Sequence, residues 1–192
     1  MTNRRIYLAG PEVFLPDGLR EQVESSKKAI LEEFGLTGLV PSDNTPELEG
    51  ASHPAFLIYQ ANRELMNQSQ GLLANLTPFR GPSADVGTVF ELGYMIARGC
   101  PSMAYTVCST PYNERVSGME RDANGLTIEP FGLSDNLMLD ASLEAQGGAL
   151  LRGNRPCSPE GFRPEDYFDE ALVRRAAEQL AGLIERQVQE QL

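Results

Sequence analysis

The feature that most constrains the fold of this chain is an alternation between short apolar runs and longer amphipathic segments. Apolar runs occupy residues 5–9, 36–40, 71–76 and 102–107, and the segments between them place apolar residues at helical spacing. Strands of a parallel sheet are buried on both faces and are joined by helical crossovers. The alternation therefore predicts an α/β domain with a mostly parallel sheet that helices cover on both faces.

The other segments complete this predicted architecture. The spacing predicts helices over 19–34, 55–69, 85–98 and 165–189, a fifth strand near Leu137 and a surface loop over 147–164. The 192 residues contain no internal repeat, so we expect one domain, residues 1–192, with the flavodoxin-like three-layer α/β/α sandwich and five strands. Such sheets bind ligands beyond the carboxyl ends of their strands, which directs attention to loops 11–18, 41–54 and 77–84.

The charge of the chain limits the class of its partners. Its formal net charge is −11, from 27 acidic and 16 basic residues. Such a surface repels a phosphate backbone, so no nucleic-acid partner is expected. No apolar run approaches the ~20 residues of a membrane helix, and the first residues lack the apolar core of a signal peptide. We expect a cytoplasmic protein, without a membrane partner, that binds a small polar ligand.

A pair of carboxylates is the most informative chemical feature. The segment ADVGTVFELGY, residues 84–94, places Asp85 where a loop becomes a helix and Glu91 six residues later. That spacing turns the side chains about 120° apart, so they converge only if Asp85 belongs to the loop or the N-cap. Asp85 has a purely structural alternative as an N-cap, and Glu91 as a solvated surface residue. The mostly apolar neighbours of Glu91 favour a functional role, and Gly87 would let a ligand approach closely.

Two carboxyl groups suit the cleavage of a glycosidic bond with retention. One acts as the nucleophile, and a second group gives a proton to the departing group. A 2-deoxy sugar lacks the electron-withdrawing 2′-hydroxyl, so its cation-like transition state forms more readily. Tyr7, at the end of the first apolar run, is placed to hydrogen-bond Glu91. A packed core tyrosine is the more common alternative.

Several other chemistries lack their residues. His53 is the single histidine, and no G-x-S-x-G segment accompanies it for a Ser-His-Asp mechanism. The three cysteines lack zinc-type spacing, so no metal site is expected. The chain also lacks a P-loop and a G-x-G-x-x-G segment, which disfavours common NTPases and nicotinamide dehydrogenases.

With these segments in view, the chain resembles the nucleoside 2-deoxyribosyltransferases from Ile6 to about Asp140. The resemblance rests on four segments, of which the third is the most specific. They are YLAGPEVFLPD (7–17), PSDN (41–44), LLANLTPFRGPSADVGTVFELGY (72–94) and FGLSDNLML (131–139).

The resemblance implies an enzyme without a cofactor that transfers deoxyribose between nucleobases through a covalent glycosyl-enzyme intermediate. Its partners would be deoxynucleosides and free nucleobases. Glu91 matches the family's nucleophile, Tyr7 the residue that positions it, and Asp85 an acidic residue that faces the nucleoside.

The resemblance also implies residues that bind the substrate. Asn136 matches an asparagine that a neighbouring subunit lends to the sugar's 5′-hydroxyl, so we expect a homo-oligomer. Phe14, Asn44 and Arg80 would border the base. Gln70 stands just before the third apolar run, where family members usually carry an aspartate that contacts the base. Glutamine cannot supply a proton at neutral pH. The tail after about Ala141 lies outside the resemblance.

Two alternatives remain open at this point. A deoxynucleoside 5′-monophosphate N-hydrolase would use water as the acceptor, but the loop GPEVFLPDG (10–18) holds Glu12 and Asp17 and no basic residue, which is expected to repel a phosphate. A nucleoside-binding module without turnover is favoured only by Gln70.

Overall fold

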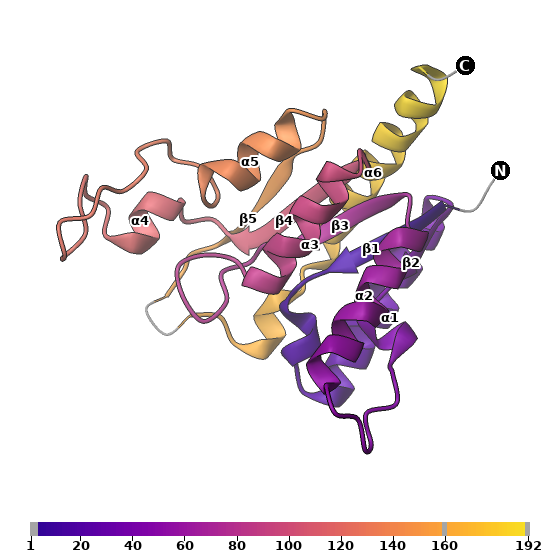
Figure 1. Cartoon of the computed structure of the whole chain (residues 1–192). Helices are drawn as coiled ribbons and strands as arrows, with labels where there is room; N and C mark the ends of the chain where they lie inside the picture. Colours follow the sequence, from indigo (N-terminus) through magenta and orange to yellow (C-terminus); the bar gives the residue numbers. More distant parts are fainter. Residues whose placement is uncertain (1–3, 159–160, 191–192) are drawn as a thin grey trace.

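The strands form one parallel sheet, as the sequence predicts. The computed structural model describes residues 4–158 and 161–190 (Figure 1). Within them, neighbouring strands pair in parallel in the order β2-β1-β3-β4-β5. The strands are β1 (Arg4–Ala9), β2 (Leu36–Leu39), β3 (Gly71–Asn75), β4 (Ser102–Cys108) and β5 (Leu150–Arg155). The chain first moves outward from β1 to β2 and then returns to β3 on the other side of β1. The strand order therefore reverses between β1 and β3, and ligands bind at such reversals in open α/β sheets.

Helices cover both faces of the sheet and complete the predicted three-layer sandwich. One face carries α1 (Asp17–Glu33) and α6 (Glu170–Glu190). The other face carries α2 (Pro54–Gln68), α3 (Val86–Ala97) and α5 (Leu137–Glu144). A short helix, α4 (Tyr112–Val116), lies in the excursion between β4 and α5. No helix in the described part of the chain is long and apolar enough to span a membrane.

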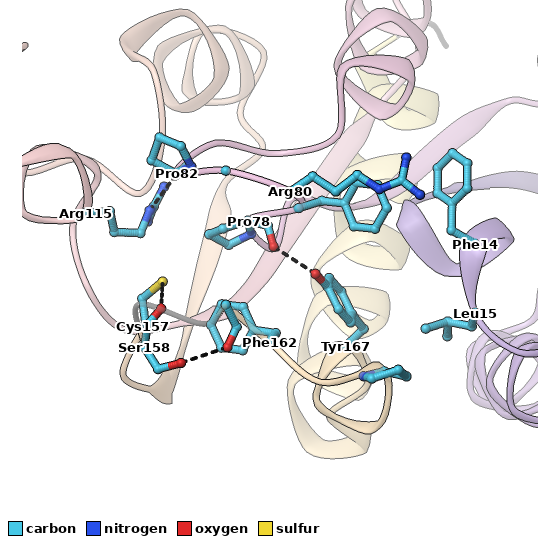
Figure 2. Close-up of a pocket in the computed structure, with 14 residues that line it drawn as sticks. Phe14, Leu15, Pro78, Arg80, Pro82, Arg115, Cys157, Ser158, Phe162 and Tyr167 are labelled. Atoms are coloured by element: carbon cyan, nitrogen blue, oxygen red, sulfur yellow. Dashed lines mark hydrogen bonds between the residues drawn. The ribbon is translucent and has the colours of Figure 1, made fainter.

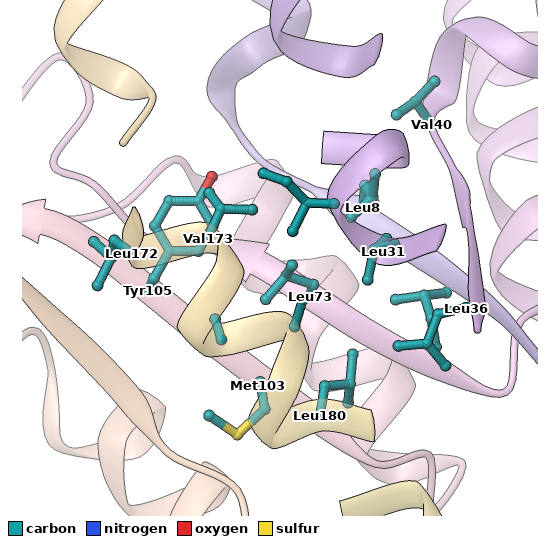
Figure 3. Packing of buried hydrophobic residues seen from close by; sticks show 14 of the residues in the cluster. Leu8, Leu31, Leu36, Val40, Leu73, Met103, Tyr105, Leu172, Val173 and Leu180 are labelled. Carbon is teal, nitrogen blue, oxygen red and sulfur yellow. The ribbon is translucent and has the colours of Figure 1, made fainter. Parts of the chain in front are cut away.

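The buried strands supply two separate hydrophobic cores. Along β1, Ile6 and Leu8 pack into the core beneath α1 and α6, whereas Tyr7 and Ala9 pack into the core beneath α2, α3 and α5. Every residue of β3 is buried, which explains its uninterrupted apolar sequence. Figure 3 shows the first core, where side chains from the strands meet those of α1 and α6; the strand residues it labels include Leu8, Leu36, Leu73 and Met103. Each fully buried leucine contributes about 1.5–3 kcal/mol relative to an exposed one.

The prediction of the fifth strand was wrong in its position. Residues 137–144 form α5, and β5 instead occupies 150–155, inside the predicted surface loop. As an edge strand, β5 is only partly buried, so it lacks the apolar run that marks the inner strands. Gly153 is required there, because a Cβ atom would lie 2.7 Å from the carbonyl oxygen of Val107.

Short 3₁₀ turns that begin with proline follow two of the strands that surround the site. They are η1 (Pro11–Phe14) after β1 and η2 (Pro41–Asn44) after β2. Proline presets the backbone angle of the first helical residue, so both loops leave the sheet in a defined direction. A third turn, η3 (Pro164–Tyr167), precedes α6, which therefore begins later than the predicted residue 165.

Candidate active site

A cavity of about 510 Å³ lies at the carboxyl end of β1, beside the reversal of strand order. Its size falls in the range of pockets that bind small molecules. The first turns of α3 form one wall, and the amino-terminal half of α1 contributes to the wall across from it. The loops after β1 and β2 close the sides. Because α1 and α3 cover opposite faces of the sheet, the cavity bridges the sheet's edge from one helical layer to the other.

Glu91 lines this cavity and is held by Tyr7. The hydroxyl of Tyr7, on β1, donates a hydrogen bond of 2.6 Å to Oε1 of Glu91, on α3. Tyr7 is fully buried, so its ring is fixed by the core that surrounds it. The second carboxylate oxygen of Glu91 has no hydrogen bond with the described residues. The contact predicted from the sequence is therefore present, and one oxygen of Glu91 is available to a ligand.

The surroundings of Glu91 bring its titration close to neutral pH. Burial raises the pKa of Glu91 to about 7, the hydrogen bond from Tyr7 lowers that pKa, and the negative charge of Asp85 raises it. Burial and the Glu91 carboxylate raise the pKa of Tyr7 well above its usual range, so Tyr7 stays protonated and remains a donor. A carboxyl group balanced between its two protonation states is typical of catalytic sites.

Asp85 is both an N-cap and a wall of the cavity. Its Oδ2 accepts hydrogen bonds from the backbone amide of Thr88 at 2.9 Å and from the Thr88 hydroxyl at 3.1 Å. Asp85 thus occupies the N-cap position of α3, which lets its side chain and that of Glu91 reach one cavity despite their spacing. The structural and functional interpretations of Asp85 therefore coexist. No hydrogen bond to Oδ1 is found among the described residues.

Glycines keep the floor of the cavity open. Gly87 lines it in the first turn of α3, where a Cβ atom would lie 3.0 Å from Oδ2 of Asp85. Gly10 lines it directly after β1, where a Cβ atom would clash with the carboxylate of Glu12. Backbone without side chains at these two positions brings a ligand close to Asp85 and to the end of β1.

Glu12 lies beneath this floor rather than in the cavity. Its side chain is buried and forms an ion pair with Lys27 of α1, which is also buried. The same carboxylate oxygen, Oε1, accepts a hydrogen bond of 2.7 Å from the amide of Asn75 and one of 3.3 Å from the hydroxyl of Tyr105. This network ties the loop after β1 to α1, β3 and β4.

Two charged residues of α1 line the cavity and were not identified from the sequence. They are Arg20 and Glu24, one helical turn apart. The side of α1 that faces the protein carries Ile30 and Leu31 over the hydrophobic core. Toward the start of the helix, where α1 extends beyond the sheet, the same side carries Arg20, Glu24 and Lys27. Charged residues at positions where an amphipathic helix should be apolar were the available signal.

Phe14, Asn44 and Arg80 occupy different positions relative to the cavity. Phe14 and Asn44 line it, and the Asn44 amide donates a hydrogen bond of 3.3 Å to the carbonyl of Ala61. Arg80 lies behind Phe14, with its guanidinium 4.9 Å from the centre of that ring and 4.6 Å from the centre of the Phe79 ring. Arg80 therefore reaches the cavity only through Phe14 in this structure.

A second cavity, of about 630 Å³, lies on the other side of Phe14 (Figure 2). It is enclosed by the loop after β3 and by the segment between β5 and α6. The hydroxyl of Tyr167 donates a hydrogen bond of 3.0 Å to the carbonyl of Pro78, and the backbone carbonyl of Tyr167 accepts one of 3.0 Å from Asn75. The tail after about Ala141, which lies outside the resemblance, thus holds the loop that leads to Asp85.

Gln70 does not belong to this site, so its predicted contact with the base was wrong for the cavity of its own chain. It precedes β3 and therefore lies at the amino edge of a parallel sheet, whereas the cavity lies at the carboxyl edge. Gln70 is exposed, accepts a hydrogen bond of 2.9 Å from the backbone amide of Arg5 and donates one of 2.7 Å to the carbonyl of Gln68. Its side chain extends the strand pairing at that edge.

Asn136 also lies outside the cavity of its own chain. It is the N-cap of α5, where its side chain accepts a hydrogen bond of 3.0 Å from the amide of Met138 and donates one of 2.6 Å to Glu129. Any contact between Asn136 and a sugar would therefore be made in another subunit. Within the described residues no group of three or more His, Cys, Asp or Glu side chains is arranged to hold a metal ion, and His53 is exposed.

Comparison with known proteins assigns this architecture to a family. The family model for nucleoside 2-deoxyribosyltransferase matches residues 6–138. An uncharacterised protein of Schizosaccharomyces pombe is 30% identical over 167 residues, which cover 74% of this chain and 78% of that protein. A solved 2-desoxiribosyltransferase from Leishmania mexicana is 35% identical with a TM-score of 0.61, over 71% of this chain and 85% of that chain. A conserved protein from Enterococcus faecalis V583 shares the fold at 18% identity and a TM-score of 0.53, over 93% of this chain and 99% of that one.

Proposed function

This chain belongs to the nucleoside 2-deoxyribosyltransferase family, and we propose that it transfers 2-deoxyribose between nucleobases through an ester of Glu91. The single observation that carries the proposal is the hydrogen bond between Tyr7 and Glu91 on the wall of a cavity of nucleoside size. Tyr7 fixes one carboxylate oxygen, and the other oxygen is left to react.

In the first half-reaction the free oxygen of Glu91 attacks the anomeric carbon of a bound deoxynucleoside. The bond between that carbon and the base breaks, its electron pair stays with the base, and the base takes up a proton that Asp85 relays from solvent. In the second half-reaction a nitrogen of another base attacks the same carbon, the ester breaks and Glu91 leaves as a carboxylate. The proton of the incoming base passes through Asp85 to solvent. Two inversions give net retention, and the kinetics are ping-pong.

The test is base exchange by the Glu91→Ala variant. The enzyme is incubated with deoxyinosine or thymidine and a second free base, and chromatography detects the new nucleoside. Loss of the nucleophile should lower exchange by at least about a thousandfold, because covalent catalysis has no replacement in the cavity. Glu178→Ala, on the exposed face of α6, is the matched control and should keep full exchange.

A second measurement examines the intermediate directly. Acid quenching of the wild-type enzyme with a deoxynucleoside alone, followed by mass spectrometry, should show one added deoxyribosyl group on the peptide that contains Glu91. Exchange by Glu91→Ala at the wild-type rate, with the variant folded by circular dichroism, would remove the basis of the proposal.

The proposed active site includes a second subunit. Asn136 cannot reach the cavity of its own chain, and its neighbour Met138 is exposed on the surface of α5. We propose that Asn136 of one subunit binds the 5′-hydroxyl of the sugar in the other, as the family resemblance implies. The enzyme would then be a homo-oligomer with shared sites.

A deoxynucleoside 5′-monophosphate hydrolase is the second candidate function. Glu12 is paired with buried Lys27, and Asp17 contacts Arg20 at 2.9 Å, so these two carboxylates oppose a phosphate less than their charges alone predict. Arg20 even lines the cavity. Three carboxylates, those of Glu24, Asp85 and Glu91, line it as well, so the balance of charge still favours an uncharged nucleoside.

Turnover of deoxyinosine against deoxyinosine 5′-monophosphate separates these two functions. The transferase should prefer deoxyinosine and form a new nucleoside, whereas the hydrolase should prefer the monophosphate and release free sugar phosphate. The third candidate, a nucleoside-binding module without turnover, loses its one supporting observation, because Gln70 lies at the opposite edge of the sheet.

A further inference from the structure

The cavity has two chemically different ends, and they face each other across the edge of the sheet. Asp85, as the N-cap, and Gly87 and Glu91 belong to α3, which covers one face of the sheet. Arg20 and Glu24 stand on α1, which covers the other face. If the anomeric carbon lies at Glu91, as the proposed function requires, the base must extend away from α3. The wall of α1 then meets the far edge of the base.

The sides of the cavity between these ends are apolar. Val13 and Phe14 come from η1 after β1, and Leu48 and Ile58 come from the loop after β2 and from α2. Phe14, Leu48 and Ile58 are exposed large hydrophobic side chains. Apolar surfaces of this kind suit the two faces of a flat heteroaromatic ring, which leaves only the edge of the ring to polar groups.

Glu24 supplies an acceptor at the end of this slot. Glu24 is only 8% exposed, and its Oε2 atom accepts a hydrogen bond of 2.8 Å from the hydroxyl of Ser42. Oε1 has no partner among the described residues, yet it is not closed off by protein atoms, so it is open to the cavity. A buried carboxylate costs folding free energy unless its oxygens find donors. The free oxygen of Glu24 is thus suited to an N–H group of a ligand.

Arg20 supplies donors beside this acceptor. Its Nη2 pairs with Asp17 at 2.9 Å, but the Asp17 side chain is 85% exposed, so this pair is weak. Nη1 of Arg20 has no partner within the described residues and is not closed off by protein atoms, whereas Nε is buried without a partner. Because Nη2 is held only by a weak pair, the end of the guanidinium that carries Nη1 and Nη2 presents a fork that fits two adjacent acceptors.

We propose that Arg20 and Glu24 form hydrogen bonds with the edge of the base and thereby select 6-oxopurines. This proposal rests on the proposed function. The guanidinium of Arg20 donates hydrogen bonds and the carboxylate of Glu24 accepts them. The pair therefore fits a base edge that offers two adjacent acceptors and, next to them, N–H donors. Hypoxanthine and guanine offer N7 and O6 as adjacent acceptors and then N1–H, to which guanine adds its 2-amino group. Adenine alternates acceptor and donor along the same edge, so it cannot satisfy a two-donor fork. The two residues are specificity-determining and take no part in bond breaking.

The test compares two purine deoxynucleosides in one tube. An equimolar mixture of deoxyinosine and deoxyadenosine is incubated with excess of a third free base, and the initial release of hypoxanthine and of adenine is measured. The ratio of these rates equals the ratio of the two kcat/KM values. The wild-type enzyme should favour deoxyinosine by at least about tenfold, the effect of unmatched polar groups at a binding site.

Two variants assign this preference to the two residues. Glu24→Gln gives the wall an amide that both donates and accepts, so the ratio should fall by about tenfold toward unity. Arg20→Met keeps much of the length of the side chain and removes the donors, and it should lower kcat/KM for deoxyinosine about tenfold with little effect on deoxyadenosine. Glu21→Gln, on the exposed face of α1, is the matched control and should leave the ratio unchanged.

The outcomes separate this inference from the proposed function. If the wild-type enzyme releases hypoxanthine and adenine at equal rates, or adenine faster, the role of Arg20 and Glu24 at the edge of the base (the base-edge assignment) is overturned. The proposed transferase function would still stand. The base-edge assignment is equally overturned if both variants, folded by thermal unfolding, keep the wild-type ratio. Absence of exchange with every donor would instead refute the transferase itself.

Discussion

At the scale of single residues, the chemistry depends on the protonation of Glu91. A carboxylate must be ionised to attack the anomeric carbon, whereas burial in the cavity favours the neutral form. The hydroxyl of Tyr7 opposes burial by donating a hydrogen bond of 2.6 Å, and the charge of Asp85 adds to the effect of burial. The pKa of about 7 is the result of these competing effects.

The pH dependence of exchange should follow this balance. We expect kcat/KM to rise with pH and to reach half of its maximum near pH 7, since the ionised form of Glu91 is the reactive one. Asp85→Asn removes a neighbouring negative charge, so its midpoint should move to lower pH. Tyr7→Phe removes the hydrogen bond that favours the carboxylate, so its midpoint should move to higher pH.

The measurement is the pH profile of kcat/KM between about pH 5 and 9, with a single donor and acceptor. A loss of rate alone would also result from damage to the fold, so the direction of the midpoint is the informative quantity. Midpoints that stay in place in both variants would mean that another group controls the profile.

At the scale of elements, the loop after β1 is held from beneath by charged and polar groups. Oε1 of Glu12 meets Lys27 of α1, Asn75 of β3 and Tyr105 of β4, and all of these side chains are buried. The ion pair offsets the desolvation of its own charges only while both partners are present. The loop that carries Phe14 is therefore fixed relative to the sheet by one carboxylate.

Breaking this ion pair should be much more costly than breaking one at the surface. Lys27→Met leaves the carboxylate of Glu12 buried without a cation, so the free energy of unfolding should fall by about 3–5 kcal/mol. The double variant Glu12→Gln/Lys27→Met removes both charges and should recover a large part of that loss. Urea unfolding at neutral pH measures each value.

The control for this experiment lies one residue further along α1. Lys28 pairs with Asp43 at 2.6 Å, but both side chains are about one-third exposed. Lys28→Met should therefore cost at most about 1 kcal/mol. Equal losses for Lys27→Met and Lys28→Met would show that the buried network has no special weight.

At the scale of the whole molecule, the layer formed by α2, α3 and α5 carries several exposed apolar side chains on its outer surface. Val86 and Phe90 of α3 and Met138 of α5 are exposed large hydrophobic residues. The ring of Phe90 lies 6.3 Å from that of Tyr59 on α2 and 6.4 Å from that of Tyr94. Apolar patches of this kind mark contacts between proteins. The same layer also carries Asn136, which the proposed function assigns to a neighbouring subunit.

Mixing two inactive variants tests whether the sites are shared. Glu91→Ala lacks the nucleophile and Asn136→Ala lacks the proposed contact with the sugar, so each alone should have low exchange. In a homodimer that exchanges subunits, half of the molecules from an equal mixture are hybrids, and each hybrid has one intact site. Activity should then recover to about a quarter of the wild-type value.

The oligomer itself is measured by light scattering after size-exclusion chromatography. The double variant Val86→Ser/Phe90→Ser should dissociate at higher concentration than the wild type, because it removes apolar area from the contact. Met119→Ser, which changes an exposed methionine in the excursion after β4, is the control. A wild-type monomer with full activity would contradict the shared site.

The layers of the fold and the segment that carries Asp85 and Glu91 could be predicted from the amino-acid sequence alone. Inner strands such as β3 are buried on both faces, so their burial is recorded in consecutive apolar residues. The edge strand β5 is only partly buried and leaves no such record, which is why its predicted position was wrong. A local pattern reports how deeply a segment is buried and does not report what lies beside it.

Which side chains meet depends on the three-dimensional arrangement of the elements. Tyr7 and Glu91 are 84 positions apart, and their contact depends on β1 lying beneath α3. Arg20 and Glu24 line the same cavity because α1 covers the opposite face and extends past the edge of the sheet. Gln70 lies outside the cavity because parallel strands all place their first residues at the other edge of the sheet. Strand order and the direction of each strand set these distances, and both arise from packing over the whole chain rather than from any one segment.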